Sequence, residues 1–382
     1  MNNLISNRIE WSNGSVMIDK NVLDLIYLVS CAVNNKIPDM ALVEAMNLNA
    51  VYDVAAKHML AVSVAMALES AGYKDDRSQK TVAMALRRTI IFENALKSVR
   101  KALEENNIWF MPLKGAVLKD LYPTFGMREF ADYDILFDAS REDDVHAIMS
   151  ELGYFTEHSG AYYHNVYCKR PFLVFEMHTA LFSDLHYKNI QKYYQNIEQR
   201  LIGDGLEKRF NREDMYLYLI AHEYKHYFYS GTGLRSMVDT YLYLNSQKMD
   251  MDYVAAEAEK LGIADFEKQN RSLSLHLFGE GELTPDEQEM LEYIISSGAF
   301  GTRGNHVENK LRRKHWSKLQ YAVDRFFVPI SKKNKKYNSF AAKYPLFYKH
   351  RILLPVLPFY RVYHAIKIGS LHAEVHAIRK AK

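Results

Sequence analysis

The sequence predicts an α+β protein in which a small mixed β-sheet lies between an N-terminal and a C-terminal helical region. Apolar residues recur at helical spacing before residue 106 and again after residue 183. Between these limits the chain holds several short runs that are typical of strands. At 382 residues, the chain is long enough to bury a substantial core and to form two or three structural units.

The first region, residues 1–105, is expected to be helical throughout. The stretches DMALVEAMNL, VAAKHMLAVSVAMALESAG and TVAMALRRTIIFENALKSVRKALEEN are rich in Ala, Leu and Met, which favour helices. Their apolar residues also recur with the period of a helix. We expect the last of these helices to end at Asn106 and Asn107.

The second region, residues 106–182, is expected to form the sheet. IWFMPL is a short apolar run typical of a strand, KGAVLKDLY predicts a short helix, and FADYDILFD predicts another strand after a turn at Pro123–Gly126. A helix is expected from about Arg141 to Leu152. Three β-rich pieces then follow, namely GYFTEH, AYYHNVYCKR and PFLVFEMHTALF.

Helical patterns return after Ser183 and continue to the C-terminus. Asn211 and Asp214 are capping residues in front of the periodic stretch MYLYLIAHEYKHYFY, and LRSMVDTYLYLN follows a break at Gly231–Gly233. We expect residues 183–300 to form a helical domain that closes a cleft over the sheet. Residues 301–382 are expected to form a basic helical tail.

Composition excludes some classes of protein. Cys31 and Cys168 are the two cysteines, too few for a disulfide scaffold or a cysteine-based zinc site, so we expect a reduced, cytoplasmic location. The N-terminal residues show no secretory signal. No stretch approaches the roughly 18 uninterrupted apolar residues of a membrane-spanning helix.

Charge is distributed unevenly along the chain. Residues 301–382 contain 19 Lys and Arg against 3 Asp and Glu, whereas residues 1–300 have a net charge of −13. A basic tail on an acidic body predicts contact with RNA, another polyanion or an anionic membrane surface. The apolar residues of RILLPVLPFYRVYHAIKIG add to the membrane hypothesis. Packing of the tail against the acidic body is the alternative.

Three carboxylates in the expected sheet are spaced so that they converge. Asp132 and Asp134 are two residues apart, and Glu176 and His178 have the same spacing on another expected strand. Since side chains alternate along a strand, the members of each pair share a face. Three carboxylates are enough to hold one or two Mg²⁺ or Mn²⁺ ions beside phosphate oxygens. For either pair alone, a solvated acidic strand end is the alternative.

Lys114 and Gly115 lie where an apolar strand runs into the short helix. Backbone N–H groups at such a turn, together with a lysine, suit a phosphate chain, although the spacing is not that of a P-loop.

The order of these pieces resembles the core of polymerase-beta-type nucleotidyltransferases: strand, Lys-Gly, helix, strand with D-x-D, and a later strand with a third acid. The stretch LKGAVLKDLYPTFGMREFADYDILFD resembles one branch of that superfamily, a family of uncharacterised nucleotidyltransferases. The EMH segment and IAHEYKHYFYSGTGLRSMVDTYLYL resemble other parts of the family, as does KYPLFYKHRILLPVLPFYRVYHAI in the tail. The resemblance covers about 105–245 and, more loosely, the tail.

The resemblance implies a metal-dependent transfer of a nucleoside monophosphate from an NTP to a hydroxyl or amine acceptor, with release of pyrophosphate. The acceptor class stays open between a small molecule, RNA and a protein. A non-catalytic module that binds nucleotide or RNA on the same fold is the alternative. In this sequence Ala116 follows Gly115, where the wider superfamily has Gly-Ser, and the third acid is Glu176 rather than an aspartate.

The resemblance also implies roles for individual residues. Asp132, Asp134 and Glu176 would bind the catalytic metal ions, and Glu176 would help to deprotonate the acceptor. Lys114 and Gly115 would hold the nucleotide triphosphate, and Arg128 would neutralise charge nearby. The other residues expected to bind nucleotide or to line its cleft are His178, Lys225, His226, Arg235 and Asp239.

The stretch HEYKH at 222–226 matches the H-E-x-x-H pattern of zinc peptidases. Such a site needs a third protein ligand. The metzincin pattern would place Gly at 229 and His at 232, but the chain has Tyr229 and Thr232. A zinc peptidase is therefore one alternative. In the two others, His222 and His226 pack within the helical region or line the nucleotide cleft.

Overall fold

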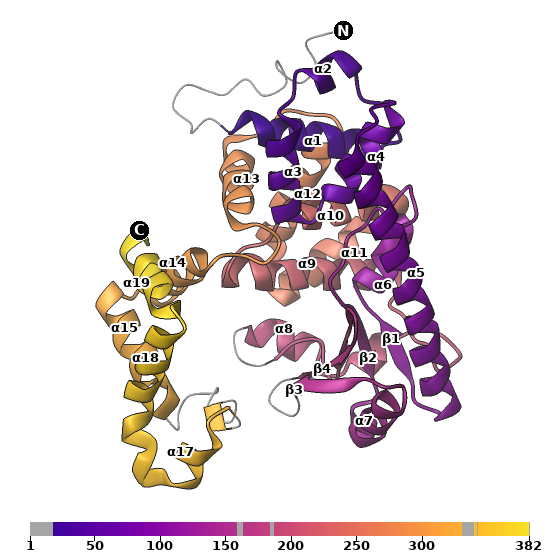
Figure 1. Cartoon of the computed structure of the whole chain (residues 1–382). Coiled ribbons are helices and arrows are strands. Elements are labelled where there is room, and N and C mark those ends of the chain that lie inside the picture. The colour runs from indigo at the N-terminus through magenta and orange to yellow at the C-terminus, as the bar shows by residue number, and fades with distance from the viewer. Residues whose placement is uncertain (1–17, 159–162, 184–186, 331–339, 342, 382) are drawn as a thin grey trace.

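The structure is a computed structural model that describes residues 18–158, 163–183, 187–330, 340–341 and 343–381. It is a mostly helical α+β fold with one five-stranded mixed sheet, so the predicted fold class is confirmed. Helices from both ends of the chain gather beside the sheet, and a C-terminal arm extends away from this body (Figure 1).

The sheet has the strand order β1-β2-β5-β4-β3. Its strands are β1 Phe110–Pro112, β2 Tyr133–Phe137, β3 Phe155–His158, β4 His164–Lys169 and β5 Leu173–His178. Strands β2 and β5 are parallel, and the other neighbours are antiparallel. The parallel pairing places Asp134 opposite Glu176 in register. Two predicted acids from distant parts of the sequence therefore meet on neighbouring strands.

Alternation of side chains gives the sheet two different faces. Tyr133, Ile135 and Phe175 point into a hydrophobic core that they share with α5 (Asp76–Glu105) and α7 (Glu142–Glu151). The side chains that alternate with these along β2 and β5 point to the opposite face. That face carries Asp134, Glu176 and His178. Packing on the first face thus holds the polar second face in place.

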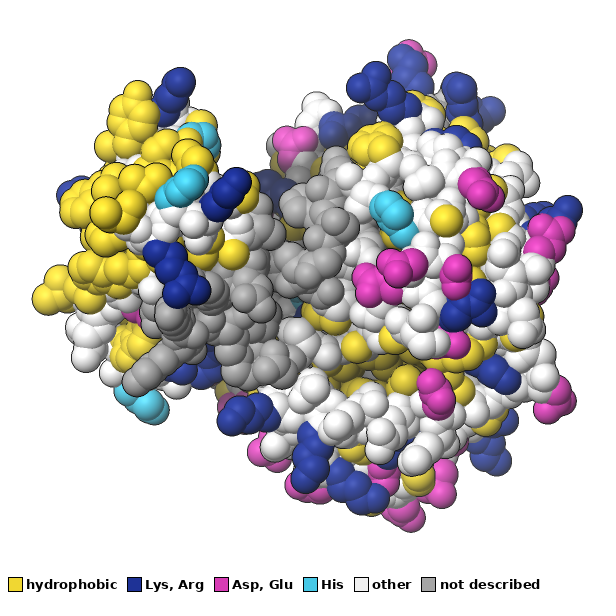
Figure 2. Space-filling view, turned by 90° about the horizontal axis from the view of Figure 1, so that it is seen from below, with side chains coloured by type: hydrophobic (Ala, Val, Ile, Leu, Met, Phe, Trp, Pro, Cys, Tyr) yellow, Lys and Arg dark blue, Asp and Glu magenta, His cyan; other side chains and the backbone are white. Residues whose placement is uncertain are grey.

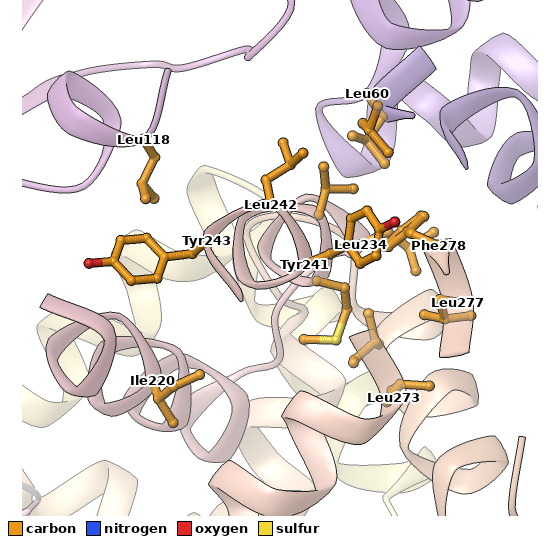
Figure 3. Close-up of a cluster of buried hydrophobic side chains, with 14 of the residues drawn as sticks. Leu60, Leu118, Ile220, Leu234, Tyr241, Leu242, Tyr243, Leu273, Leu277 and Phe278 are labelled. Atoms are coloured by element: carbon orange, nitrogen blue, oxygen red, sulfur yellow. The ribbon is translucent and has the colours of Figure 1, made fainter. Parts of the chain in front are cut away.

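A second core joins helices from both ends of the chain. Its N-terminal helices are α1 Lys20–Val33, α3 Leu48–His58 and α4 Ala61–Ser70. Its later helices are α9 Arg212–Tyr229, α10 Leu234–Ser246, α11 Met251–Leu261, α12 Ala264–Phe278 and α13 Pro285–Ser297. Leu60, Leu234 and Phe278 are among the side chains that interlock there (Figure 3). The two helical flanks share this core, and the division into four regions stays a prediction.

Local signals explain where several helices begin and end. The side chain of Asn211 accepts a hydrogen bond from the backbone N–H of Asp214, so the predicted cap of α9 is confirmed. Thr284 and Glu287 form a capping box at α13. Shorter helices are α2 Met40–Glu44, α6 Gly115–Leu118 and α8 Lys188–Tyr193.

The C-terminal arm contains α14 Arg303–Lys314, α15 Lys318–Phe327, α17 Pro345–Lys349, α18 Leu357–Lys367 and α19 Ser370–Lys380. It joins the body through α14, where the side-chain amide of Asn309 donates to the backbone carbonyl of Tyr227 on α9. None of the helices in the described residues has the length and apolar character needed to cross a membrane.

Candidate functional site

A cavity of about 400 Å³ lies between the polar face of the sheet and helices α9 and α10. Every site residue predicted from the sequence lines it. These residues are Lys114, Gly115, Arg128, Asp132, Asp134, Glu176, His178, Lys225, His226, Arg235 and Asp239. One wall of the cavity comes from the sheet, which carries the acids, and from the turn after β1, which carries Lys114. Helices α9 and α10 form the opposite wall.

Asp134 is buried and has two cationic partners. Lys114 Nζ lies 2.7 Å from Asp134 Oδ1, and His178 Nε2 lies 3.0 Å from the same oxygen. Burial alone would raise the pKa of Asp134, but Lys114 and His178 outweigh it and hold that pKa well below its usual range. Asp134 is therefore ionised at neutral pH.

His178 lies between two carboxylates. Its Nε2 is 3.5 Å from Glu176 Oε2, and His164 Nε2 approaches the same oxygen at 3.8 Å. Burial lowers the pKa of His178, yet the hydrogen bonds to Asp134 and Glu176 raise it overall. For Glu176, burial acts to raise the pKa, and the hydrogen bond from His178 and nearby cations lower it overall. The His178 ring nitrogen Nε2 thus lies between two ionised acids.

Asp132 is the carboxylate without a counterion. Among the residues that the structure describes, its side chain makes no hydrogen bond or ion pair. Burial, followed by the charge of Asp134, raises the pKa of Asp132 to about 6. A half-buried carboxylate in this state is costly to ionise unless a cation approaches it.

The donor set fits a hard divalent cation. Asp132, Asp134 and Glu176 offer carboxylate oxygens, the ligands that Mg²⁺ and Mn²⁺ prefer, and the unpaired Asp132 leaves one negative charge to neutralise. Within the described ranges, however, the three residues whose ligand atoms lie within 4.8 Å of one another are His164, Glu176 and His178. The three carboxylates do not form such a group in the described residues, so binding of one cation by all three requires these side chains, and the partners of Asp134, to rearrange.

The wall formed by α9 is rich in nitrogen bases. Lys225 Nζ donates to the hydroxyl of Tyr163 at 3.3 Å, and burial, followed by the charge of Lys114, lowers the pKa of Lys225 to about 7. Burial and the nearby lysines hold the pKa values of His222 and His226 well below their usual range. Both rings are neutral, so Lys114, Lys225 and Arg235 supply the positive charge that an anionic ligand would meet.

Comparison with protein families agrees with this arrangement. A family described as uncharacterised nucleotidyltransferase matches residues 44–279, which is more than half of the chain and includes both walls of the cavity. The chain belongs to this nucleotidyltransferase family. The resemblance seen over residues 105–245 is thereby confirmed, whereas the match does not reach the tail segment at 343–366. No curated protein and no solved structure shows a significant match.

In this nucleotidyltransferase family member, the described surroundings of HEYKH do not resemble a zinc site. His222 Nε2 lies 3.1 Å from His226 Nε2 and 3.1 Å from Lys114 Nζ, a cation that would oppose a bound metal. Glu223 turns toward α10, where Ser236 Oγ donates to it at 2.7 Å. Among the described residues no third ligand completes a metal cluster with the two histidines. The zinc-peptidase alternative is therefore not supported.

Arg128 and Asp239 join the two walls of the nucleotidyltransferase cavity. The Arg128 guanidinium donates two hydrogen bonds of 2.8 Å to the Asp239 carboxylate, and the Tyr122 hydroxyl donates a third at 2.8 Å. A Cβ at Gly115 would lie 3.1 Å from Arg128 Nη1, so glycine lets the guanidinium reach this place. The pair fastens the loop before β2 to α10, so the Arg128 guanidinium is already neutralised by a protein carboxylate.

Sequence reasoning missed two neighbours of the acids. His164 lies opposite His178 on β4, and Tyr163 precedes it at the mouth of the cavity. The segment AYYHNVYCKR contains both, but their place depends on the antiparallel register of β4 and β5. Glu223, which the zinc pattern alone would single out, is buried on the side of α9 that faces α10.

Proposed function

We propose that the protein is a metal-dependent nucleotidyltransferase that moves a nucleoside monophosphate from an NTP to a hydroxyl or amine acceptor and releases pyrophosphate. The observation that carries this proposal is the composition of one cavity. It holds the three carboxylates of Asp132, Asp134 and Glu176 on one wall and faces them with basic groups from α9 and α10. Such a reaction needs carboxylates that hold a divalent cation, and it needs basic side chains beside them that bind the phosphates of the NTP.

Asp132, Asp134 and Glu176 would hold Mg²⁺ or Mn²⁺. When bound, the ion stabilises negative charge on the entering and leaving oxygens. Lys114 is paired with Asp134 in the cavity, and release from that pair makes its ammonium group available to the triphosphate. Lys225 and Arg235 add positive charge on the opposite wall.

Glu176 is the proposed acceptor of the proton that leaves the hydroxyl or amine. Its lowered pKa keeps it ionised at neutral pH, so it can take a proton from an acceptor within hydrogen-bond reach. His178 donates to it and fixes the orientation of the carboxylate. The class of acceptor stays open between a small molecule, RNA and a protein.

The test is a transfer assay with the four NTPs labelled at the α-phosphate, in the presence of Mg²⁺ or Mn²⁺, against RNA, protein and small-molecule acceptors. We expect at least one NTP to label an acceptor or the protein itself. The double variant Asp132→Asn/Asp134→Asn is expected to lose the activity by at least about 100-fold, since two metal-binding charges disappear.

A matched control is Asp120→Asn/Asp138→Asn, which removes two aspartates that do not line the cavity. The control is expected to keep full activity. Transfer that survives in the Asp132→Asn/Asp134→Asn variant would overturn the proposal. Binding of NTP without any turnover by the wild-type protein would instead support the non-catalytic alternative.

A further inference from the structure

The C-terminal arm carries positive charge that the body does not neutralise. Its three acids, Glu308, Asp324 and Glu374, all pair with basic residues of the arm itself, as in Lys310–Asp324 at 2.8 Å and Arg325–Glu374 at 3.2 Å. Within the described ranges no Lys or Arg of the arm forms an ion pair with the body. The described Lys and Arg side chains of the arm are therefore not held by salt bridges to acidic residues elsewhere.

The same arm exposes large apolar side chains in two stripes. On α15, Leu319, Val323 and Phe327 are spaced four residues apart, so they share one helix face, and Leu319 is 74% exposed. The second stripe starts in the 3₁₀ turn Arg351–Val356, where Ile352 is 87% exposed, and continues along α18. Its exposed members on α18 are Phe359, Tyr363 and Ile366.

These stripes form a surface rather than scattered contacts. In the view from below, apolar side chains gather over the arm, with Lys and Arg side chains at the margins (Figure 2). Along the chain, Lys318 lies next to Leu319 of the first stripe, and Lys349, Arg351 and Lys367 lie near the residues of the second. Contiguous exposed apolar surface rimmed by charge marks an interaction site.

Chemistry distinguishes between the partners that could cover this surface. RNA would engage the Lys and Arg side chains, but it offers little for Ile352 or Leu319 to be buried against. A lipid interface takes up apolar side chains below the headgroups and attracts Lys and Arg to anionic headgroups. We propose that the C-terminal arm docks the protein on an anionic membrane surface through the stripes of α15 and α18.

Vesicle flotation with the full chain tests the proposal. We expect the protein to float with vesicles of phosphatidylcholine and phosphatidylglycerol, to float poorly with phosphatidylcholine alone, and to dissociate as salt rises. The variant Ile352→Ser/Phe359→Ser/Tyr363→Ser is expected to weaken binding by about tenfold or more, because three apolar anchors are lost. Lys349→Gln/Arg351→Gln/Lys367→Gln is expected to weaken binding to the anionic vesicles and to reduce its salt dependence, because three of the basic groups are lost.

The control variant is Ile37→Ser/Met84→Ser, which removes two apolar side chains that are each 72% exposed on the body. It is expected to float like the wild type. All variants are compared by circular dichroism and thermal unfolding, and Ile352→Ser alone replaces the triple variant if the latter unfolds. Absence of flotation with anionic vesicles, or unchanged binding by the apolar variant, would overturn the proposal. Salt-sensitive RNA binding that ignores the apolar substitutions, without flotation, would assign the arm to nucleic acid instead.

Discussion

Lys114 and Asp134 form a buried ion pair at the base of the cavity, with 2.7 Å between Nζ and Oδ1. Lys114 adopts a backbone φ of +34°, a conformation that residues other than glycine rarely take. Strain of this kind costs on the order of 1–3 kcal/mol and concentrates at functional sites. The pair therefore links an unfavourable backbone conformation to the residue that we expect to bind metal.

Replacement of Lys114 separates this strain from its charge. Lys114→Gly relieves the backbone strain and removes the ammonium group, whereas Lys114→Ala removes the ammonium group and keeps the strain. We expect both variants to lose nucleotide transfer, and Lys114→Gly to be more stable than Lys114→Ala by about 1 kcal/mol in urea unfolding. Equal stability of the two variants, or transfer activity in Lys114→Gly, would contradict this account.

Binding of metal is expected to depend on pH through Asp132. Its pKa is raised to about 6, and a proton must leave the carboxylate before a cation can bind. Affinity for Mn²⁺ in the absence of nucleotide should therefore fall as the pH drops below about 6. Calorimetric titration across this range measures the effect. In Asp132→Asn the affinity should be lower and nearly independent of pH, and a wild-type profile in that variant would count against Asp132 as a ligand.

Affinity for NTP is expected to fall as the pH rises through the pKa of Lys225. The pKa of this lysine is lowered to about 7, so the ammonium charge is present below that pH and is lost above it. Lys225→Arg should keep its charge and lose the pH dependence, because arginine stays protonated. Equilibrium binding of a fluorescent NTP analogue gives the readout. Lys119→Gln, outside the cavity, serves as the control and should retain the wild-type dependence.

The Arg128–Asp239 pair is expected to be essential for stability. Arg128→Met leaves the carboxylate of Asp239, whose side chain is 12% exposed, without its guanidinium partner, which should cost roughly 3–5 kcal/mol. The double variant Arg128→Met/Asp239→Leu removes both charges and should recover much of that loss. Urea unfolding of the two single variants and the double variant forms a double-mutant cycle. Additive effects would show that the two residues do not act as a pair.

The folded protein is expected to become less stable as the pH rises, because the carboxyl of Glu223 loses its proton. Burial raises the pKa of this carboxyl from its ordinary value to about 7, so its protonated form is favoured in the folded protein. The stabilisation is fully present below the unfolded pKa and is lost as the pH rises through about 7. The difference in melting temperature between the wild type and Glu223→Gln should therefore change as the pH rises from the pKa of the unfolded carboxyl to about 7. A constant difference across that range would rule out this titration.

Local sequence patterns predicted much of the fold. Helical periodicity identified the long helices at both ends, and runs of β-branched and aromatic residues identified all five strands of the described sheet. The D-x-D spacing predicted that Asp132 and Asp134 share one site, and both line the cavity, although β2 begins only at Tyr133 and Asp132 precedes it. These signals depend on neighbours in the sequence, so they can be read without tertiary contacts.

Tertiary structure decided which groups meet. The parallel register of β2 and β5 set Asp134 beside Glu176, and the same register brought His178 between them. Pairing of Arg128 with Asp239 depended on α10 packing beside the loop before β2. Register and packing arise from contacts between segments far apart in the sequence, which periodicity does not encode. The sequence by itself determined the elements and the acids, whereas only the packed structure decided their partners and their charge states.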